Sequence, residues 1–258
     1  AWNVTDCNHL FILNDKEEAA YFHNDIEQLT QALDIFYFPD SFKKTGQFQE
    51  YNSSHSMLRT EALMKLTGGN THKKVLITYP EALYEKVAGN TAYNANMVHV
   101  KVGETLKVDA LLEKLVSWGF EHSDFVYGPG QYAVRGGILD IYSFGNEKPY
   151  RMELFGDEVD SIRLFDPETQ LSERKLMQVT LIANMDTRAV THQKMSLPDF
   201  LPENTVVWIK DPSYVQGVIG QMEEKLADWL QTGNKVRVSD DEEMLLGAED
   251  FETAGNLM

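Results

Sequence analysis

Cysteine is almost missing from this sequence, because Cys7 is the only one among 258 residues. A single cysteine can form no internal disulfide, and it cannot supply a zinc site built on CxxC pairs. The seven histidines show no H-x-x-x-H or H-E-x-x-H spacing, so a histidine-based metal site has little support. These shortages predict a reducing, cytoplasmic setting and no bound metal.

Long apolar runs are also missing, since none approaches the roughly 20 residues that cross a bilayer. The first residues lack the pattern of a secretory signal. The sequence contains no G-x-x-x-x-G-K-[ST] motif, no dinucleotide-binding fingerprint and no G-x-S-x-G elbow. We therefore expect no membrane partner, no cofactor held by this chain and no catalytic residues.

Basic residues are in deficit, with 23 Lys and Arg against 40 Asp and Glu, and the formal net charge is -17. Affinity for DNA comes largely from cations that neutralise phosphates. The deficit therefore argues against broad nucleic-acid binding by this chain, while a local basic patch is compatible with it. Its simplest physical consequence is solubility.

The first hundred residues alternate between strand and helix patterns. Strand patterns fall at 9–13, 35–38 and 75–79. Helical patterns fall at about 15–33, 57–66 and 81–87, and a polar segment at 41–56 is typical of a loop. Strands that alternate with helices predict a largely parallel sheet covered on both faces, over residues 1–97.

The pattern changes near Val98. A helix predicted from about Thr105 to Trp118 is followed by a strand-rich stretch that glycine turns interrupt. We expect a small α+β domain with antiparallel strands at 98–186. A second α/β piece follows at 187–258, with a strand at 206–209 and a helix at about 215–230. It shows no stop signal of a finished domain, so we expect it to be truncated at its C-terminus.

Arginines recur along the predicted strands of the small domain. Side chains alternate between the two faces of a strand. In the strand that ends at Phe155, this alternation places Arg151, Glu153 and Phe155 on one face, opposite an apolar face. Arg163 lies on the returning strand, and Arg135 precedes Gly136–Gly137, where a bulge would re-aim its side chain.

Two interpretations of these arginines remain open from periodicity alone. In the first, they form cross-strand ion pairs with Glu153, Asp157 or Asp160, each pair contributing tenths of a kcal/mol. In the second, they and Phe155 form a protein-binding patch, because arginine and aromatic residues are enriched at binding hot spots. Periodicity favours the first interpretation, because most surface ion pairs have no further role.

Three motifs carry a resemblance to a known family. They are Tyr127–Tyr142 with the sequence YGPGQYAVRGGILDIY, Pro149–Phe155 with PYRMELF, and Asp160–Asp166 with DSIRLFD. Together they resemble the N-terminal region of the bacterial transcription-repair coupling factors, which is homologous to the B component of excinuclease ABC. The flanking stretches 56–60, 75–87 and 196–202 also fit, so the resemblance covers nearly the whole chain.

The resemblance implies a fold and a partner. The fold is α/β: a degenerate helicase-like, P-loop-type parallel domain with an inserted small α+β antiparallel domain. The inserted domain recruits the A component of excinuclease ABC in transcription-coupled nucleotide excision repair. Carried over by position, the contact residues are Arg135, Arg151 and Phe155, to which we add Glu153 and Arg163 on geometry.

The resemblance also implies what this chain lacks. The parent protein is expected to be an ATP-dependent DNA translocase of helicase superfamily 2. Its ATP and Mg²⁺ would bind downstream motor domains, and its other domains would contact RNA polymerase and DNA. The fragment itself is expected to be a monomer without enzymatic activity.

Two competing identities are considered. The damage-verifying B component of excinuclease ABC would need a P-loop and an acidic pair after a strand. Here the strand at 206–209 runs instead into Lys210-Asp211-Pro212, which would spoil magnesium coordination. The stretch at 79–96 is also too short for that family's damage-verifying hairpin. The other competitor is an unrelated α/β interaction scaffold.

Overall fold

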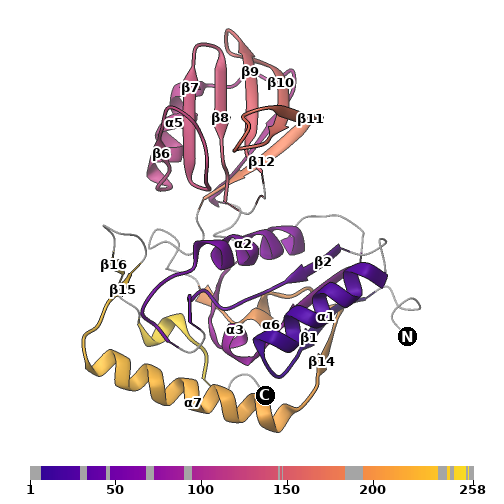
Figure 1. Cartoon of the computed structure of the whole chain (residues 1–258), viewed down its shortest axis with the longest axis vertical. Coiled ribbons are helices and arrows are strands. Elements are labelled where there is room, and N and C mark those ends of the chain that lie inside the picture. The colour runs from indigo at the N-terminus through magenta and orange to yellow at the C-terminus, as the bar shows by residue number, and fades with distance from the viewer. Residues whose placement is uncertain are drawn as a thin grey trace. The chain divides into compact units, whose positions relative to one another are not determined.

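The computed structural model describes residues 7–29, 34–44, 47–67, 73–89, 95–144, 146, 148–183, 194–237, 243–244, 247–253 and 255. The chain divides into two compact units (Figure 1). Unit 1 comprises residues 1–90 and 192–258, and unit 2 comprises residues 91–191. Unit 2 therefore falls between two segments of unit 1 in the sequence.

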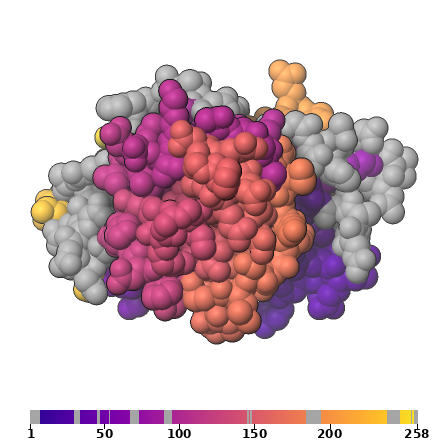
Figure 2. All heavy atoms as spheres, turned by 90° about the horizontal axis from the view of Figure 1, so that it is seen from above, coloured from indigo at the N-terminus to yellow at the C-terminus, as the bar shows by residue number. Residues whose placement is uncertain are grey.

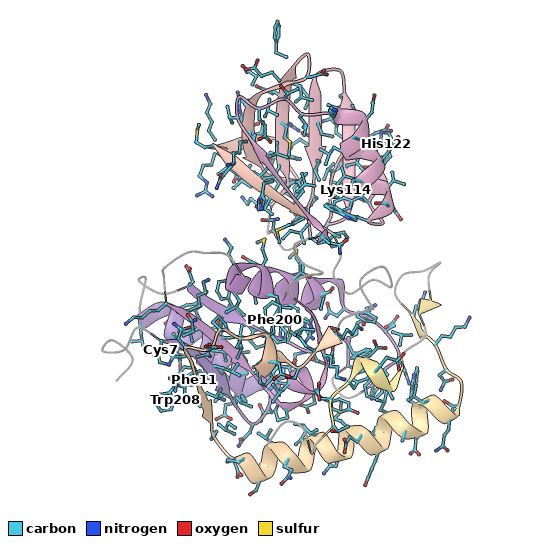
Figure 3. All side chains as sticks on the ribbon, turned by 180° about the vertical axis from the view of Figure 1, so that it is seen from behind. Cys7, Phe11, Lys114, His122, Phe200 and Trp208 are labelled. Carbon is cyan, nitrogen blue, oxygen red and sulfur yellow. The ribbon has the colours of Figure 1, made fainter. Side chains whose placement is uncertain are left out.

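Unit 1 is built on a four-stranded parallel sheet with the strand order β14-β1-β3-β2. Its strands are β1 (Asn8–Ile12), β2 (Asp34–Tyr37), β3 (Lys74–Thr78) and β14 (Thr205–Ile209). All five residues of β3 are buried, as expected for a strand in the interior of a parallel sheet. In the edge strand, Trp208 stacks on Phe11 of β1 at a centroid distance of 5.9 Å (Figure 3).

Helices and short strands complete unit 1. Those before unit 2 are α1 (Lys16–Leu29), α2 (Ser53–Thr67), α3 (Pro80–Tyr84) and β4 (Val87–Ala88). Those after it are β13 (Lys194–Met195), α6 (Leu197–Phe200), α7 (Pro212–Gln231), β15 (Val236–Arg237), β16 (Glu243–Met244) and the 3₁₀ helix η2 (Ala248–Asp250). Helix α1 packs on β2 and β3, α2 packs on β2, and α3 packs on α7.

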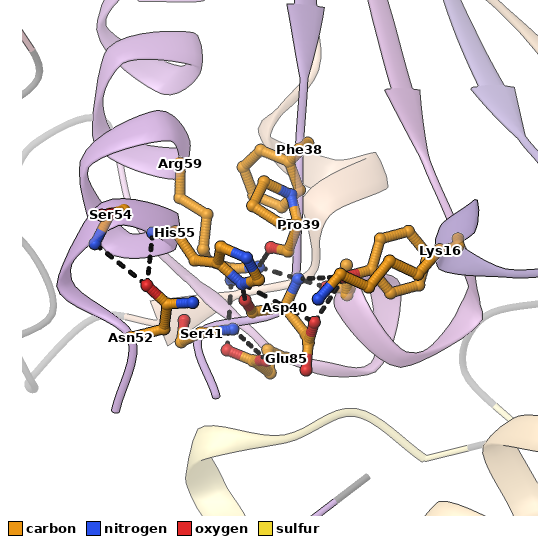
Figure 4. A network of polar contacts seen from close by, with 12 residues as sticks. Lys16, Phe38, Pro39, Asp40, Ser41, Asn52, Ser54, His55, Arg59 and Glu85 are labelled. Carbon is orange, nitrogen blue, oxygen red and sulfur yellow. Dashed lines mark hydrogen bonds and ion pairs between the residues drawn. The ribbon is translucent and has the colours of Figure 1, made fainter. Parts of the chain in front are cut away.

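A buried polar network ties the ends of β2 and β3 to helix α2 (Figure 4). The hydroxyl of Tyr79 donates to the carboxylate of Asp40 and accepts from the Asp40 backbone N–H at 2.9 Å. Arg59 donates to the Pro39 carbonyl at 2.8 Å and lies 3.6 Å from the Glu85 carboxylate. Glu85 in turn accepts from the Ser41 N–H at 2.8 Å. After β2 the chain leaves the sheet, and these bonds satisfy backbone groups there that no neighbouring strand pairs with.

The same network explains two errors in the predicted boundaries. Helix α2 begins at Ser53 rather than Met57, because the Asn52 side chain accepts from the N–H groups of Ser54 and His55 and caps it. Helix α3 ends at Tyr84 and not at Val87. Glu85 is held by Ser41, and the next residues form β4, which pairs with β13.

Unit 2 is dominated by a six-stranded sheet with the order β11-β10-β9-β8-β7-β6. Its strands are β6 (Glu121–His122), β7 (Gln131–Arg135), β8 (Ile138–Ile141), β9 (Tyr150–Phe155), β10 (Glu158–Phe165) and β11 (Ser172–Leu176). All neighbours are antiparallel except β6 and β7. Strands β5 (Met97–Lys101) and β12 (Gln178–Ile182) form a separate antiparallel pair, and α5 spans Val108–Ser117. In Figure 2 the atoms of unit 2 grade from magenta to orange across the face that is shown.

The two faces of this sheet differ in chemistry. One face carries the main core, in which Leu139, Ile141 and Met152 pack with Leu111 and Leu115 of α5. The other face carries a small cluster of Val126, Ala133, Tyr142 and Phe165, with charged side chains around it. The alternation predicted for the strand ending at Phe155 is confirmed by its burial pattern.

The fold class is confirmed at the level of a mixed α/β chain with a parallel sheet in one unit and a mainly antiparallel sheet in the other. The segments predicted separately as 1–97 and 187–258 contribute to one sheet, because β14 pairs with β1. In the part of the chain that the structure describes, no helix is long and apolar enough to span a membrane. Nor do three metal-ligating side chains gather anywhere in those residues.

The buried carboxyl of Glu85 makes the stability of unit 1 depend on pH. Burial raises the pKa of Glu85 to about 7, and this effect outweighs the attraction of Arg59. The protonated form therefore stabilises the fold at low pH, and this contribution is lost as the pH rises through about 7.

We predict that Glu85→Gln removes this contribution to the pH dependence, which is at most about 3 kcal/mol. Glutamine keeps the shape of the side chain and does not titrate. The check is urea unfolding of wild type and variant at about pH 5 and about pH 8. The wild type should lose more stability than the variant between these two conditions, and an identical loss in both proteins would contradict the prediction.

Candidate protein-interaction face

The five predicted residues lie on one face of the sheet in unit 2. Arg135 is the last residue of β7, Arg151, Glu153 and Phe155 alternate along β9, and Arg163 is in β10. The register pairs Arg151 with Arg163 across β9 and β10. The structure thus places all five on one face of the sheet, on β7, β9 and β10, and we call this set the arginine face.

A buried carboxylate that the predicted site did not include lies at the centre of the arginine face. Asp140 of β8 is fully buried and stands opposite Arg151 in the register. Arg151 donates to it twice, from Nε to Oδ1 and from Nη2 to Oδ2, each at 2.8 Å. Arg135 donates from its Nη2 to the same Oδ2. One carboxylate therefore holds two guanidinium groups.

Arg151 is held on every side. Besides Asp140, its Nη1 donates to the Gln170 carbonyl at 3.0 Å, and its guanidinium lies 4.4 Å from the centre of the Phe165 ring. The hydrogen bonds to Asp140 raise the pKa of Arg151, so its charge is fixed. Its side chain is mostly covered, with 15% exposed. Bidentate geometry with stacking is what arginine provides and lysine cannot.

Arg135 connects the face to a loop. Its Nη1 donates to the carbonyl of Asp124, and its guanidinium lies 5.0 Å from the centre of the Phe125 ring. About a third of its side chain remains exposed. The expectation that these arginines pair with Glu153, Asp157 or Asp160 is wrong for Arg135 and Arg151, which use Asp140.

That expectation is right for Arg163. Its Nη2 lies 3.2 Å from the Glu153 carboxylate, which also accepts from the Ser161 hydroxyl at 2.7 Å. Both members of the ion pair are about one third exposed, so water screens their attraction. This pair is an ordinary surface ion pair.

Phe155 is the most exposed large apolar side chain in the part of the chain that the structure describes, at 84%. It ends β9, next to a hairpin whose first loop residue, Gly156, has φ +62. A positive φ at this position is typical of the tight turns that join antiparallel strands. The Phe155 ring is therefore exposed to water at the end of the strand, opposite Glu158 in the register.

The arginine face combines fixed charges with one exposed aromatic ring. Two arginines around one aspartate leave a local excess of one positive charge, within a chain whose net charge is -17. Exposed aromatic rings and arginines are the residue types that are enriched at protein-binding hot spots.

Unit 1 carries an ion pair at the end of β14, next to β1 in the sheet. Lys210 there pairs with Glu18 in the first turn of α1. Only residues 13–15 join β1 to α1, and that connection contains no glycine. Glu17 and Glu18 place negative charge at the N-terminal end of α1, where a phosphate would be repelled. These residues do not form a P-loop.

Comparisons with known proteins test the resemblance that the three motifs carry. Residues 98–186 match the sequence model of the family described as the UvrB interaction domain. The chain is 32% identical to a transcription-repair-coupling factor of Staphylococcus aureus (strain bovine RF122 / ET3-1) over 178 residues, or 69% of the chain and 15% of that protein. The resemblance predicted from the three motifs is thereby confirmed.

Other bacteria have similar proteins. The chain is 28% identical to the transcription-repair-coupling factor of Escherichia coli (strain K12) over 173 residues, which is 67% of the chain and 15% of that protein. It is 27% identical to that of Bacillus subtilis (strain 168) over 179 residues, which is 69% of the chain and 15% of that protein. The matches to these relatives span about 15% of their length.

We predict that Arg151→Ala lowers the free energy of unfolding far more than Arg163→Ala. Removing Arg151 leaves the buried Asp140 with one cation instead of two, which costs about 3 kcal/mol. Removing Arg163 breaks an exposed pair and costs less than about 1 kcal/mol. Urea denaturation of the two variants, with circular dichroism as the signal, measures both losses. Equal losses would mean that Asp140 does not depend on Arg151.

Proposed function

We propose that this chain is the part of a transcription-repair coupling factor that recruits UvrA, the A component of excinuclease ABC, during nucleotide excision repair. The observation that carries the proposal is Phe155, an aromatic ring exposed to water at the end of the strand that carries the ordered Arg151. It lies in the segment that matches the UvrB interaction domain, and the chain resembles transcription-repair-coupling factors from several bacteria.

The role of each residue follows from its contacts. Phe155 enters an apolar pocket on UvrA, since burying an exposed aromatic ring contributes more than any other single contact of this face. Glu153 and Arg163, each partly exposed, form the polar rim and set the orientation of docking. Arg135 and Arg151 fix the surface of the arginine face and give that surface its positive charge.

The rest of the parent protein is proposed from the resemblance to the transcription-repair-coupling factors. Unit 1 is a degenerate helicase-like domain that carries unit 2 and has no ATPase activity. The parent is an ATP-dependent DNA translocase in the cytoplasm, which binds ATP and Mg²⁺, RNA polymerase and DNA through other domains. In this scheme the fragment is a monomer that binds UvrA and turns over no substrate.

We predict that Phe155→Ala weakens binding to UvrA about thirtyfold or more, because truncating an aromatic anchor costs about 2 kcal/mol or more. The measurement is calorimetric titration of purified UvrA with this chain. The Phe155 side chain is exposed, so the variant should keep the circular dichroism spectrum of the wild type.

Met177→Ala is the matched control. Met177 is also a large apolar residue of unit 2, with 75% exposed, and it lies outside the arginine face, between β11 and β12. Its truncation should leave the affinity unchanged. Equal losses in both variants would point to a nonspecific apolar contact, and a wild-type chain that does not bind UvrA would overturn the proposed function.

A further inference from the structure

Besides Phe155, a pair of exposed aromatic side chains lies next to the arginine face. Phe125 and Tyr127 are 48% and 61% exposed, and their ring centroids are 6.5 Å apart. Both belong to the segment 123–130, which joins β6 to β7 and which we call the aromatic loop. Exposed apolar side chains that form a contiguous patch mark interaction sites on protein surfaces.

The aromatic loop is tied down by its own hydrogen bonds. The side chain of Gln131 accepts from the N–H groups of Tyr127 and Gly128, at 2.9 and 3.0 Å. The Ser123 hydroxyl donates to the Phe125 carbonyl at 2.7 Å. Between the two exposed rings, Val126 is fully buried in the small cluster under the loop. The backbone that carries the two rings is therefore held in place.

The Asp140 cluster holds the same loop from two sides. Arg135 bonds to the carbonyl of Asp124 and lies over the ring of Phe125, while its other end is held by Asp140. On the other side, the Gln170 side chain donates to the Val126 carbonyl at 3.2 Å. The Gln170 backbone carbonyl accepts from Arg151, which Asp140 also holds.

The strand ends that carry Arg135 and Phe155 are neighbours. Gly137, in the turn after Arg135, accepts from the N–H of Leu154 at 2.7 Å. A methyl group added at Gly137 would lie 2.8 Å from the Leu154 carbonyl oxygen, so the two backbones are in close contact. The aromatic loop is thus attached, through Arg135, to the end of the sheet where Phe155 is exposed.

We infer that the aromatic loop forms a second apolar part of the docking surface, and that Arg135 is a positioning residue which acts on the partner through this loop. The inference rests on the proposed function and extends the surface from Phe155 to Phe125 and Tyr127. The partner, UvrA, supplies apolar side chains to both rings. Because the loop is already ordered, binding it requires little further loss of conformational entropy.

This role for Arg135 differs from direct capture of a partner carboxylate. Its Nη1 and Nη2 already donate to Asp124 and Asp140 within the chain. If Arg135 acts through the loop, removing it and removing the two rings abolish the same contact. Combining the two changes then lowers the affinity no further than one of them alone. For independent contacts, the fold-losses in affinity would multiply.

The test is a double-mutant cycle on binding to purified UvrA. Its members are wild type, the loop variant Phe125→Ala with Tyr127→Ala, Arg135→Ala, and the triple variant. The loop variant should weaken binding about tenfold or more, as truncation of interface aromatics does. The affinity of the triple variant should lie within about twofold of the affinity of the loop variant.

Two further measurements distinguish the positioning role of Arg135 from a loss of folding stability in the variants. Arg135→Lys retains the charge beside Asp140 and loses the planar group that lies over Phe125. It should bind as weakly as Arg135→Ala, whereas direct capture of a carboxylate predicts partial rescue. Amide hydrogen exchange at Tyr127 and Gly128 should also accelerate in Arg135→Ala, because the loop loses its tie.

Phe155→Ala in the same titrations separates the two proposals. If Phe155→Ala loses binding while the loop variant binds like the wild type, the proposed function stands and the aromatic loop is excluded from the surface. A triple variant whose loss equals the product of the separate losses overturns the positioning role of Arg135. If wild type does not bind UvrA at all, the proposed function and this inference both fail.

Discussion

The outer face of unit 2 depends on one buried carboxylate, that of Asp140. It is fully removed from water, so it requires the two cations that it holds. Through Arg135 it fixes the loop at Asp124, and through Arg151 it fixes the turn at Gln170. Three neighbouring strands and two connections therefore share a single electrostatic centre, and its loss would loosen all of them together.

The two faces of the same sheet illustrate a division of tasks. The face toward α5 is apolar and is packed with residues such as Leu139 and Met152. The opposite face, which is the arginine face, is held by ion pairs and hydrogen bonds. Phe155 is not packed into either apolar cluster and stays exposed. An aromatic side chain with that much exposure contributes little to folding. Under the proposed function, a fixed neighbourhood would let it enter a pocket without reorganisation.

Much of this arrangement could be predicted from the sequence, and the reason for each failure is specific. Alternation along β9 placed Arg151, Glu153 and Phe155 on one face, since that depends only on local geometry. The partner of Arg151 could not be found in this way, because Asp140 lies on another strand and its register is set by tertiary packing. An aspartate alternating with core residues in β8 was nevertheless a signal of a buried, paired charge.

In unit 1, too, the polar side chains act within the fold. Motor domains of the P-loop type keep a glycine-rich loop and an acidic pair at the carboxyl ends of their strands. Here Lys210, after β14, pairs with Glu18 of α1, so a structural ion pair occupies this edge of the sheet. Polar side chains of unit 1 bond to groups on other helices and strands, and these bonds hold the sheet and its helices together. Unit 1 is therefore held together by contacts within its own sheet and helices.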